Sequence, residues 1–345
     1  MCKMRTSSDV LAEAVWVDTG SRLHFGFYST TGDAGLFAGM GVAVDVPSFR
    51  AEVRAHEGIS VSGPGADRLT GLVEEVVRAL GVPGAKVRAS SVIPAHVGLG
   101  STTQMKLGMA KALSDLYGLG MTVRELAFIL GRGEFSGIGT IAFELGGFII
   151  DTGRRTGRIS GPDDLPRPLL RLDVPVSWRF LLLIREGARG LSEEEERDLL
   201  LGLEPMPEHA ASRICYLVMR RLLPAIIWDD VLSFGRALTE IQELVGEYFA
   251  PYQGGIFMDE AADELKALLL SEGAHGVGQS SWGPTLYAIT TADEYEALKK
   301  TVERFLEEAG LRYQILIARP RNRGARIERL SPHDDGGWEA ACPKT

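Results

Sequence analysis

Cysteine is scarce in this sequence, and the three residues present, Cys2, Cys215 and Cys342, lie far apart. They form neither a closely spaced metal-binding pair nor a disulfide framework. The sequence also lacks an apolar run that approaches the roughly 18 residues of a membrane span. Its first nine residues are polar, and no apolar segment of a signal peptide follows them. We therefore expect a cytoplasmic protein.

Basic residues are outnumbered by acidic ones, 37 against 46, which gives a formal net charge of −9 at pH 7. General nucleic-acid binding needs a basic surface, so we expect neither nucleic acid nor a membrane as a partner. Hydrophobic residues make up 45% and charged residues 24% of the 345-residue chain, proportions typical of a soluble globular protein. This length is sufficient for one large or two medium domains with complete cores.

Glycine, in contrast, is abundant, with 41 residues. Glycine permits tight turns and a close approach of the backbone to a ligand. The clusters predict several loops that converge on a ligand, although many ordinary turns would give the same pattern. They fall at 32–41, 98–100, 131–139, 146–157, 254–255 and 273–283.

The most informative cluster follows a β-prone run that ends at Ile93 and precedes an amphipathic helical pattern. Free N–H groups and partial positive charge at a helix N-terminus favour an anion. The spacing differs from a Walker loop and from a dinucleotide-binding loop, because it lacks the lysine of the first and the third glycine of the second. An ordinary strand–turn–helix corner is the alternative. The predicted phosphate site consists of Gly98, Leu99, Gly100, Ser101, Thr102, Thr103 and Gln104.

A second candidate is the β-like segment 21–27. Arg22 beside His24 can clamp a phosphate or a carboxylate, because a guanidinium group offers two parallel hydrogen bonds. The alternative is a polar strand surface that faces solvent. Strand alternation places Arg22, His24 and Gly26 on one face and Leu23, Phe25 and Phe27 on the other.

Two carboxylates stand out in the stretch 136–151, where glycine clusters flank a helix-like segment. We predict that Glu144 and Asp151 hold Mg²⁺ next to a polyphosphate; structural hydrogen-bond acceptors are the alternative. Arg154 and Arg155 follow at once and are candidates for phosphate contact, or else form a solvated basic linker.

The last candidate is a glycine-rich and serine-rich turn at 276–285 that leads into an expected strand. The indole ring of Trp282 offers a flat apolar face on which an aromatic ligand can stack. A buried structural tryptophan is the alternative. The polar residues of this turn that we include in the site are Gln279, Ser280 and Ser281.

Mixed strands and helices in two halves predict an α+β protein. We expect an N-terminal domain at 14–160, a C-terminal domain at 175–330, and flexible tails at 1–13 and 331–345. Helical patterns cover 70–80, 123–130, 192–202, 208–223, 230–248, 259–271 and 293–309, and β-like patterns cover 14–17, 23–28, 42–46, 50–55, 148–150, 180–184, 286–290 and 313–318.

In order and spacing, these motifs resemble the GHMP kinase superfamily, whose loop reads Pro-x-x-x-Gly-Leu-Gly-Ser-Ser; here Thr102 replaces the last serine. The resemblance covers residues 14 to about 330 and implies a two-domain fold. Its N-terminal domain would resemble domain 2 of ribosomal protein S5, and its C-terminal domain would be ferredoxin-like. The superfamily's kinases usually carry an aspartate where this chain has Gly139, so a kinase would need another carboxylate such as Asp151.

Within the superfamily, the chain resembles the β-ribofuranosylaminobenzene 5′-phosphate synthase family of methanopterin biosynthesis. The combination of motifs is more specific than any one loop. The matching motifs are Arg22-Leu23-His24-Phe25-Gly26, Val97-Gly98-Leu99-Gly100-Ser101, Thr103-Gln104, Gly131-Arg132-Gly133, Ser136-Gly137-Ile138-Gly139-Thr140, Gly146-Gly147-Phe148-Ile149 and Gly278-Gln279-Ser280-Ser281-Trp282-Gly283-Pro284-Thr285.

This resemblance implies a phosphoribosyl (pentosyl) transferase. Phosphoribosyl pyrophosphate (PRPP) would react with 4-aminobenzoate or 4-hydroxybenzoate and release pyrophosphate and CO₂, with Mg²⁺ assisting the leaving group. A homodimer is possible, and a superfamily kinase that uses ATP or a non-catalytic binding protein are alternative functions. We assign catalysis to Arg22, His24 and Gln104, PRPP binding to residues 98–104 and Arg154, and the aromatic acceptor to Phe25 and residues 279–282.

Overall fold

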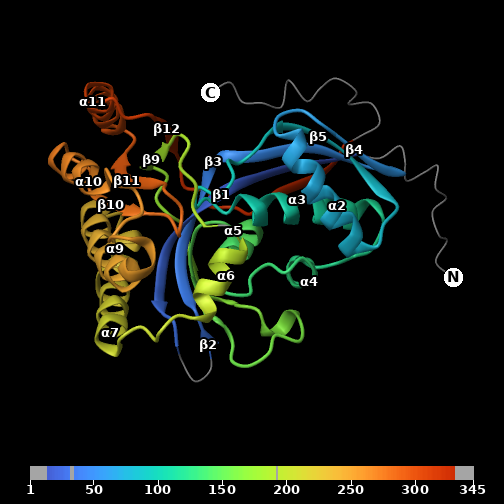
Figure 1. Ribbon diagram of the computed structural model, residues 1–345, viewed down its shortest axis with the longest axis horizontal. Helices are drawn as coiled ribbons and strands as arrows, with labels where there is room; N and C mark the ends of the chain where they lie inside the picture. Colours follow the sequence, from blue (N-terminus) through green and yellow to red (C-terminus); the bar gives the residue numbers. More distant parts are fainter. Residues whose placement is uncertain (1–13, 32–34, 192, 331–345) are drawn as a thin grey trace.

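The computed structural model describes residues 14–31, 35–191 and 193–330, and the tails expected at 1–13 and 331–345 lie outside them. Among the described residues, two large sheets lie side by side, each accompanied by its own helices, and the two short strands at Gly35–Leu36 and Arg154–Arg155 pair in a third, two-stranded sheet (Figure 1). The expected α+β class is confirmed by this arrangement.

Seven strands of the described residues form the first sheet, in the order β13-β1-β3-β5-β4, with β6 paired to β3 and β8 to β6. In β5, Ala85, Val87 and Ala89 are buried and alternate with polar residues, as a half-buried strand requires. The strands are β1 (Ala14–Ser29), β3 (Ala38–Ala55), β4 (Gly58–Ser62), β5 (Gly84–Ser91), β6 (Phe148–Asp151), β8 (Pro168–Leu172) and β13 (Arg326–Leu330).

Strands β1 and β3 are longer than the sequence pattern predicts. The two stretches expected at 14–17 and 23–28 belong to β1, and those at 42–46 and 50–55 belong to β3. The pairing of β1 with β3 shifts in register between Thr19 and Ser21 and again between His24 and Phe27. Such bulges preserve the strand while they break its alternation, so a continuous strand looks like two short ones in the sequence.

Helices α2 and α3 cover one side of this sheet. Helix α3 packs against β1 and β3, and α2 packs against α3 (Figure 1). Leu69, Leu72, Val73 and Val76 of α2 are buried at helical spacing. The elements of this half are α2 (Ala66–Leu80), α3 (Ser101–Leu116), α4 (Val123–Ile129), α5 (Ile138–Leu145), the short strands β2 (Gly35–Leu36) and β7 (Arg154–Arg155), and the 3₁₀-helix η1 (Pro162–Asp164).

The second sheet is antiparallel, in the order β10-β11-β9-β12. The turn expected at 276–285 begins with a strand, because 276–279 pair with β11. The elements of this half are β9 (Trp178–Arg185), β10 (Gly276–Gln279), β11 (Leu286–Thr291), β12 (Tyr313–Ala318), α9 (Val231–Gln253), α10 (Ala262–Ser271) and α11 (Tyr295–Glu308).

Four further helical segments lead from β9 to α9. The helix expected at 208–223 is formed, but its last part, Val218–Leu222, is a π-helix rather than an α-helix. The segments are α6 (Glu193–Leu201), α7 (Glu208–Leu217), η2 (Val218–Leu222) and α8 (Leu223–Ile227). In Figure 1, α6 lies in front of the first sheet, between it and the loops around α4.

The chain returns to the first sheet at its end. Strand β13 pairs with Ala14–Asp18 of β1, and β8, which lies between the two predicted domains, also joins this sheet. The predicted C-terminal domain, 175–330, therefore gives its last strand to the N-terminal sheet.

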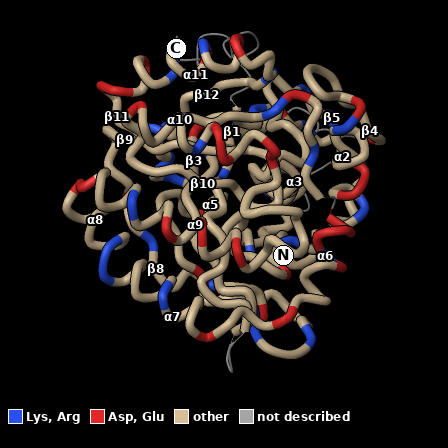
Figure 2. Tube along the Cα trace, turned by 60° about the vertical axis from the view of Figure 1, so that its left-hand side comes forward, with Lys and Arg blue, Asp and Glu red and all other residues tan. Residues whose placement is uncertain are grey.

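Acidic and basic residues of the described chain are both distributed around the molecule (Figure 2). None of the helices in the described ranges combines the length and the apolar character that crossing a bilayer requires.

Candidate active site

The glycine loop brings six predicted residues to one wall of a small cavity. His96, Gly98 and Gly100 have positive φ angles of 53°, 81° and 74°, which turn the chain sharply before α3. Helix α3 begins at Ser101 without a side-chain cap, so N–H groups of its first turn remain free for a ligand. The cavity is lined by Gly98, Leu99, Gly100, Ser101, Thr102 and Thr103, as the prediction of a phosphate loop requires.

A turn from the second sheet closes against this loop. Thr285 Oγ1 donates to the carbonyl of Val97, and Ser280 Oγ donates to the carbonyl of Gly98, both at 2.6 Å. A Cβ atom on Gly98 would lie 2.1 Å from the Ser280 carbonyl oxygen, so only glycine allows this approach. Ser280 is therefore a structural link between the two halves of the site rather than part of a cavity wall.

A larger cavity of about 350 Å³ adjoins the first. Aromatic rings contribute much of its wall: Phe27, Phe135, Phe249, Phe257 and Trp282. Trp282 is only 7% exposed and packs edge-on against Phe249, with ring centroids 4.4 Å apart. The indole is thus both buried and part of the site. Gln279 and Ser281 line the same cavity.

The two cavities share a wall and form adjoining lobes of one site. We call the smaller cavity the loop lobe and the larger the aromatic lobe. The residues that line both lobes are Arg22, Thr103, Arg132, Glu193, Glu196, Ser281 and Trp282.

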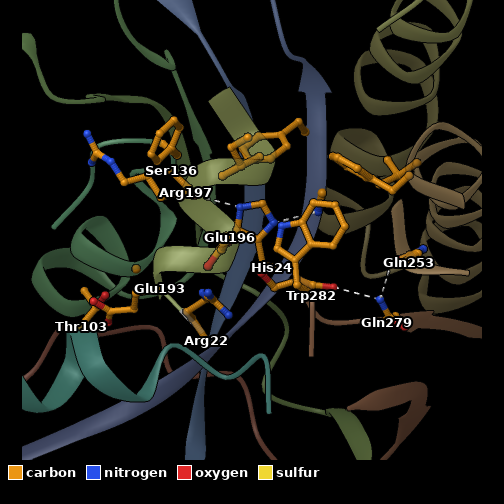
Figure 3. Close-up of a pocket in the computed structure, with 18 of the residues that line it drawn as sticks. Arg22, His24, Thr103, Ser136, Glu193, Glu196, Arg197, Gln253, Gln279 and Trp282 are labelled. Carbon is orange, nitrogen blue, oxygen red and sulfur yellow. Dashed lines mark hydrogen bonds between the residues drawn. The ribbon is translucent and has the colours of Figure 1, made fainter. Parts of the chain in front are cut away.

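Arg22 occupies the junction of the lobes (Figure 3). Its backbone N–H donates to the Leu99 carbonyl at 3.2 Å, and its Nη1 donates to the Gly98 carbonyl. Burial lowers the pKa of Arg22 to about 10, with Glu196 acting in the opposite direction, so the guanidinium remains charged at neutral pH. Its buried Nε has no hydrogen-bond partner among the described residues. A cation held in this way favours an anionic ligand.

His24 lies next to Arg22 and is neutral. Burial, together with the charge of Arg22, lowers the pKa of His24 to about 3. Its Nδ1 accepts the backbone N–H of Gly26 at 3.0 Å, and its Nε2 lies 2.9 Å from Ser136 Oγ. His24 lines the aromatic lobe, but with this pKa it is not a proton acceptor near neutral pH.

Helix α6 supplies an acidic wall that the sequence motifs did not predict. Glu193 and Glu196 line both lobes and flank Arg22 in Figure 3. Glu193 forms an ion pair with both terminal nitrogens of Arg132, at 2.6 and 2.8 Å. Burial raises the pKa of Glu196. A run of four glutamates is typical of a solvated helix face; the one sequence signal for this wall was the Gly131-Arg132-Gly133 motif.

Two predicted polar contacts lie away from both lobes. Gln104 is 2% exposed, and its amide donates to the Gly139 carbonyl at 2.8 Å, which joins α3 to α5. Arg154 donates to the Gly157 carbonyl, and its guanidinium lies 5.8 Å from the ring centroid of Phe135. The predictions of Gln104 as catalytic and Arg154 as phosphate-binding are therefore corrected: both side chains are structural.

The predicted stacking of an acceptor on Phe25 is also wrong. Phe25 is fully buried against Phe148 and Tyr287, whereas Phe27 lines the aromatic lobe. Between them, Gly26 has a φ of 95°, and the register of β1 shifts. Strand alternation puts Phe25 and Phe27 on the same face, opposite His24. The bulge instead brings Phe27 to the side of His24, with ring centroids 5.2 Å apart, and leaves Phe25 in the core.

The predicted metal pair is not assembled. Both carboxylate oxygens of Asp151 accept backbone N–H groups, from Gly39, Gly137 and Gly153, each at 2.9 Å. Burial raises the pKa of Asp151 to about 6 against the effect of these three bonds. Glu144 is exposed and lines neither lobe. Asp151 thus has the alternative role, that of a structural acceptor, and the described residues contain no group of three metal-ligating side chains.

Comparison with known proteins defines the class first. The sequence matches the family GHMP kinases N terminal domain at residues 67–147 and the family GHMP kinases C terminal at residues 221–310. A homoserine kinase from Cytophaga hutchinsonii has the same fold, with a TM-score of 0.65 at 17% identity; the match covers 95% of this chain and 100% of that one. The fold is therefore that of the GHMP kinases.

Relatives that are similar in sequence identify the family within this class. A beta-ribofuranosylphenol 5'-phosphate synthase from Archaeoglobus fulgidus is 32% identical over 320 residues, which cover 90% of this chain and 98% of the relative. A homoserine kinase from Methanopyrus kandleri is 24% identical over 284 residues, 77% of this chain and 86% of the relative. The chain belongs to the beta-ribofuranosylphenol 5'-phosphate synthase family. The predicted resemblance is confirmed, although these relatives are named for a phenol and not for an aminobenzene.

Proposed function

We propose that this enzyme transfers the phosphoribosyl group of PRPP to 4-hydroxybenzoate and releases pyrophosphate and CO₂. The observation that carries the proposal is the pair of adjoining lobes, one suited to phosphate and one to an aromatic ring, with Arg22 and Trp282 at their junction. We choose 4-hydroxybenzoate over 4-aminobenzoate because the named relative forms a ribofuranosylphenol, and loss of CO₂ from a hydroxybenzoate leaves a phenol.

The pyrophosphate group of PRPP occupies the loop lobe. Backbone N–H groups of the first turn of α3 and the hydroxyls of Ser101, Thr102 and Thr103 bind its oxygens there. Arg22 binds the oxygen that carries the bond to the ribosyl carbon, because its charged side chain lines both lobes and so lies where they meet. Charge that develops on the leaving group is thus stabilised by fixed donors.

The aromatic acid occupies the other lobe, with its ring against Trp282, Phe249 and Phe27. Its carboxyl-bearing carbon attacks the ribosyl carbon while the bond to pyrophosphate breaks. The bond between ring and carboxylate then breaks, CO₂ leaves, and the electron pair restores the aromatic ring. No protein nucleophile is needed for this step. The low pKa of His24 agrees with this, because such a histidine is too weak a base to activate a nucleophile.

Mg²⁺ fits the acidic wall better than it fits the pair predicted from sequence. Glu193 and Glu196 both line the loop lobe, but both oxygens of Glu193 already bind Arg132. Glu196 is therefore the carboxylate that would hold Mg²⁺, which commonly binds one or two carboxylates together with substrate phosphates. When bound, the ion would neutralise negative charge on the pyrophosphate.

A kinase function of the superfamily is less well supported. The kinases usually carry an aspartate where this chain has Gly139, which lines the aromatic lobe. Asp151 cannot substitute, because it is fully buried and both its oxygens are occupied by backbone N–H groups.

The test is an assay with PRPP, Mg²⁺ and either carboxyl-labelled 4-hydroxybenzoate or 4-aminobenzoate. We expect release of CO₂ and pyrophosphate in equal amounts, faster with 4-hydroxybenzoate. Formation of ADP from ATP in the presence of small-molecule alcohols, without release of CO₂, would instead establish a kinase. Arg22→Ala should lower kcat/KM at least a hundredfold through loss of a charged contact, whereas Arg154→Ala should leave it within twofold.

A further inference from the structure

We propose that Ser136 donates the hydrogen bond that binds the carboxylate of the aromatic acceptor, and that His24 is the positioning residue that directs this hydroxyl. The inference rests on the proposed function, since it assigns a role at the same site. Ser136 lines the aromatic lobe only, and it belongs neither to the glycine loop nor to the acidic wall.

The direction of the Ser136 hydroxyl follows from the hydrogen bonds around His24. The N–H of Gly26 can only donate, so His24 Nδ1 is an acceptor and carries no proton. The low pKa of His24 makes the ring neutral, which places its single proton on Nε2. The 2.9 Å contact to Ser136 is therefore a bond that His24 donates.

Ser136 Oγ receives a second bond from the backbone N–H of Ile138, at 3.3 Å. A serine hydroxyl has two acceptor positions and one proton. With both acceptor positions occupied, the proton must point away from His24 and Ile138. No bond among the described residues takes this proton. Since Ser136 lines the aromatic lobe, the hydroxyl is a donor available to an acceptor atom of a ligand there.

The same bonds exclude a Ser–His nucleophile. A histidine that activates serine must accept the hydroxyl proton, whereas His24 already donates to that oxygen. The backbone beside Ser136 is also fixed, because the N–H of Gly137 donates to buried Asp151 at 2.9 Å. Ser136 is thus a donor of fixed position and direction, which suits binding rather than covalent chemistry.

The acceptor atom is the carboxylate of the aromatic substrate. Ser136 contributes to the aromatic lobe and is not part of the loop lobe, where we place the pyrophosphate. Ser136 and Trp282 both line the aromatic lobe, and His24 lies between them in Figure 3. An oriented donor binds an anionic oxygen more strongly than a neutral one.

Calorimetric titration of the Ser136→Ala variant tests the proposal without relying on turnover. The probes are 4-hydroxybenzoate and phenol, which lacks the carboxylate. We expect roughly 10- to 100-fold weaker binding of 4-hydroxybenzoate and unchanged binding of phenol, as loss of one bond to a charged group predicts. Thr140→Val is the matched control. This variant also loses a hydroxyl from the same turn, but Thr140 lines neither lobe.

Several outcomes would overturn the inference. Equal binding of 4-hydroxybenzoate by Ser136→Ala and the wild type would do so, as would a raised KM for PRPP with an unchanged KM for the benzoate. Failure of the proposed function is a different result: the wild type itself would then bind no 4-hydroxybenzoate and release no CO₂.

His24 is tested by comparing two substitutions. Gln at this position retains an N–H donor at nearly the same distance, and Leu retains none. We expect His24→Gln to preserve the binding preference for 4-hydroxybenzoate over phenol and His24→Leu to lose it. A limb of the kcat/KM pH profile near pH 6.5 that is present in the wild type and absent from His24→Gln would contradict a positioning role, because it would show His24 titrating.

Discussion

Replacement of Gly98 by alanine is expected to separate the two halves of the active site. The new Cβ would lie 2.1 Å from the Ser280 carbonyl oxygen and 2.9 Å from the Cα of Gly283. The loop must therefore move by roughly 1 Å, since such contacts normally exceed about 3.3 Å. Three side-chain bonds to the carbonyls of Val97 and Gly98, from Arg22, Ser280 and Thr285, would break or lengthen.

At about 1 kcal/mol for each bond, these losses amount to roughly 3 kcal/mol. The positive φ of 81° adds about 1 kcal/mol for a residue with a side chain. Gly58→Ala is the matched control, because Gly58 has a φ of 78° and its new Cβ would have no neighbouring atom within 4 Å. We expect this variant to lose only the backbone contribution, about 1 kcal/mol.

Urea unfolding followed by tryptophan fluorescence gives both free energies, and steady-state kinetics gives KM for PRPP. We expect Gly98→Ala to be roughly 3 kcal/mol less stable than Gly58→Ala and to bind PRPP at least tenfold more weakly. Equal stability of the two variants together with an unchanged KM would refute the view that contact between loop and turn maintains the site.

Two further predictions concern residues that the structure removes from the site. Gln104→Ala removes the hydrogen bond from its buried amide to the half-buried Gly139 carbonyl, so we expect a stability loss of roughly 1 kcal/mol, measured by urea unfolding, with both KM values within twofold. A large fall in kcat without a loss of stability would restore its catalytic assignment. Asp151 has a pKa of about 6 when folded, above the value of about 3.9 expected when unfolded. The folded state therefore binds the proton more tightly, and stability from this group increases as the pH falls through 6. Relative to Asp151→Asn, the wild type should gain roughly 1.4 kcal/mol between pH 7 and pH 5; a constant difference would contradict the raised pKa.

The loop could be predicted from the sequence because its chemistry is local. Two glycines followed by hydroxyl residues at a helix start are enough to define it, and residues 98–103 line the lobe. Trp282 was predictable for a similar reason, since it lies in a glycine-rich turn of its own. The α+β class followed from strand and helix periodicity.

The acidic wall could not be predicted, because it depends on where α6 packs. Glu193 and Glu196 are far from the loop in sequence, and only the fold brings them opposite Thr103 and Arg22. The sequence cannot show that Phe27 rather than Phe25 lines the aromatic lobe, because this depends on the bulge at Gly26, which interrupts the strand alternation. Gln104 and Asp151 are polar residues near the site. The sequence cannot reveal that their side chains form hydrogen bonds with backbone groups and are therefore not available to a ligand.

Strand β13 has a consequence for the order in which the molecule can be assembled during synthesis. Residues 326–330 pair with Ala14–Asp18, which are among the earliest described residues to emerge from a ribosome. Until translation reaches Leu330, the edge of β1 at 14–18 has open N–H and C=O groups on that side. A nascent or truncated chain would thus present an unpaired edge to other chains. We expect aggregation during expression to increase when the chain is shortened to end before β13.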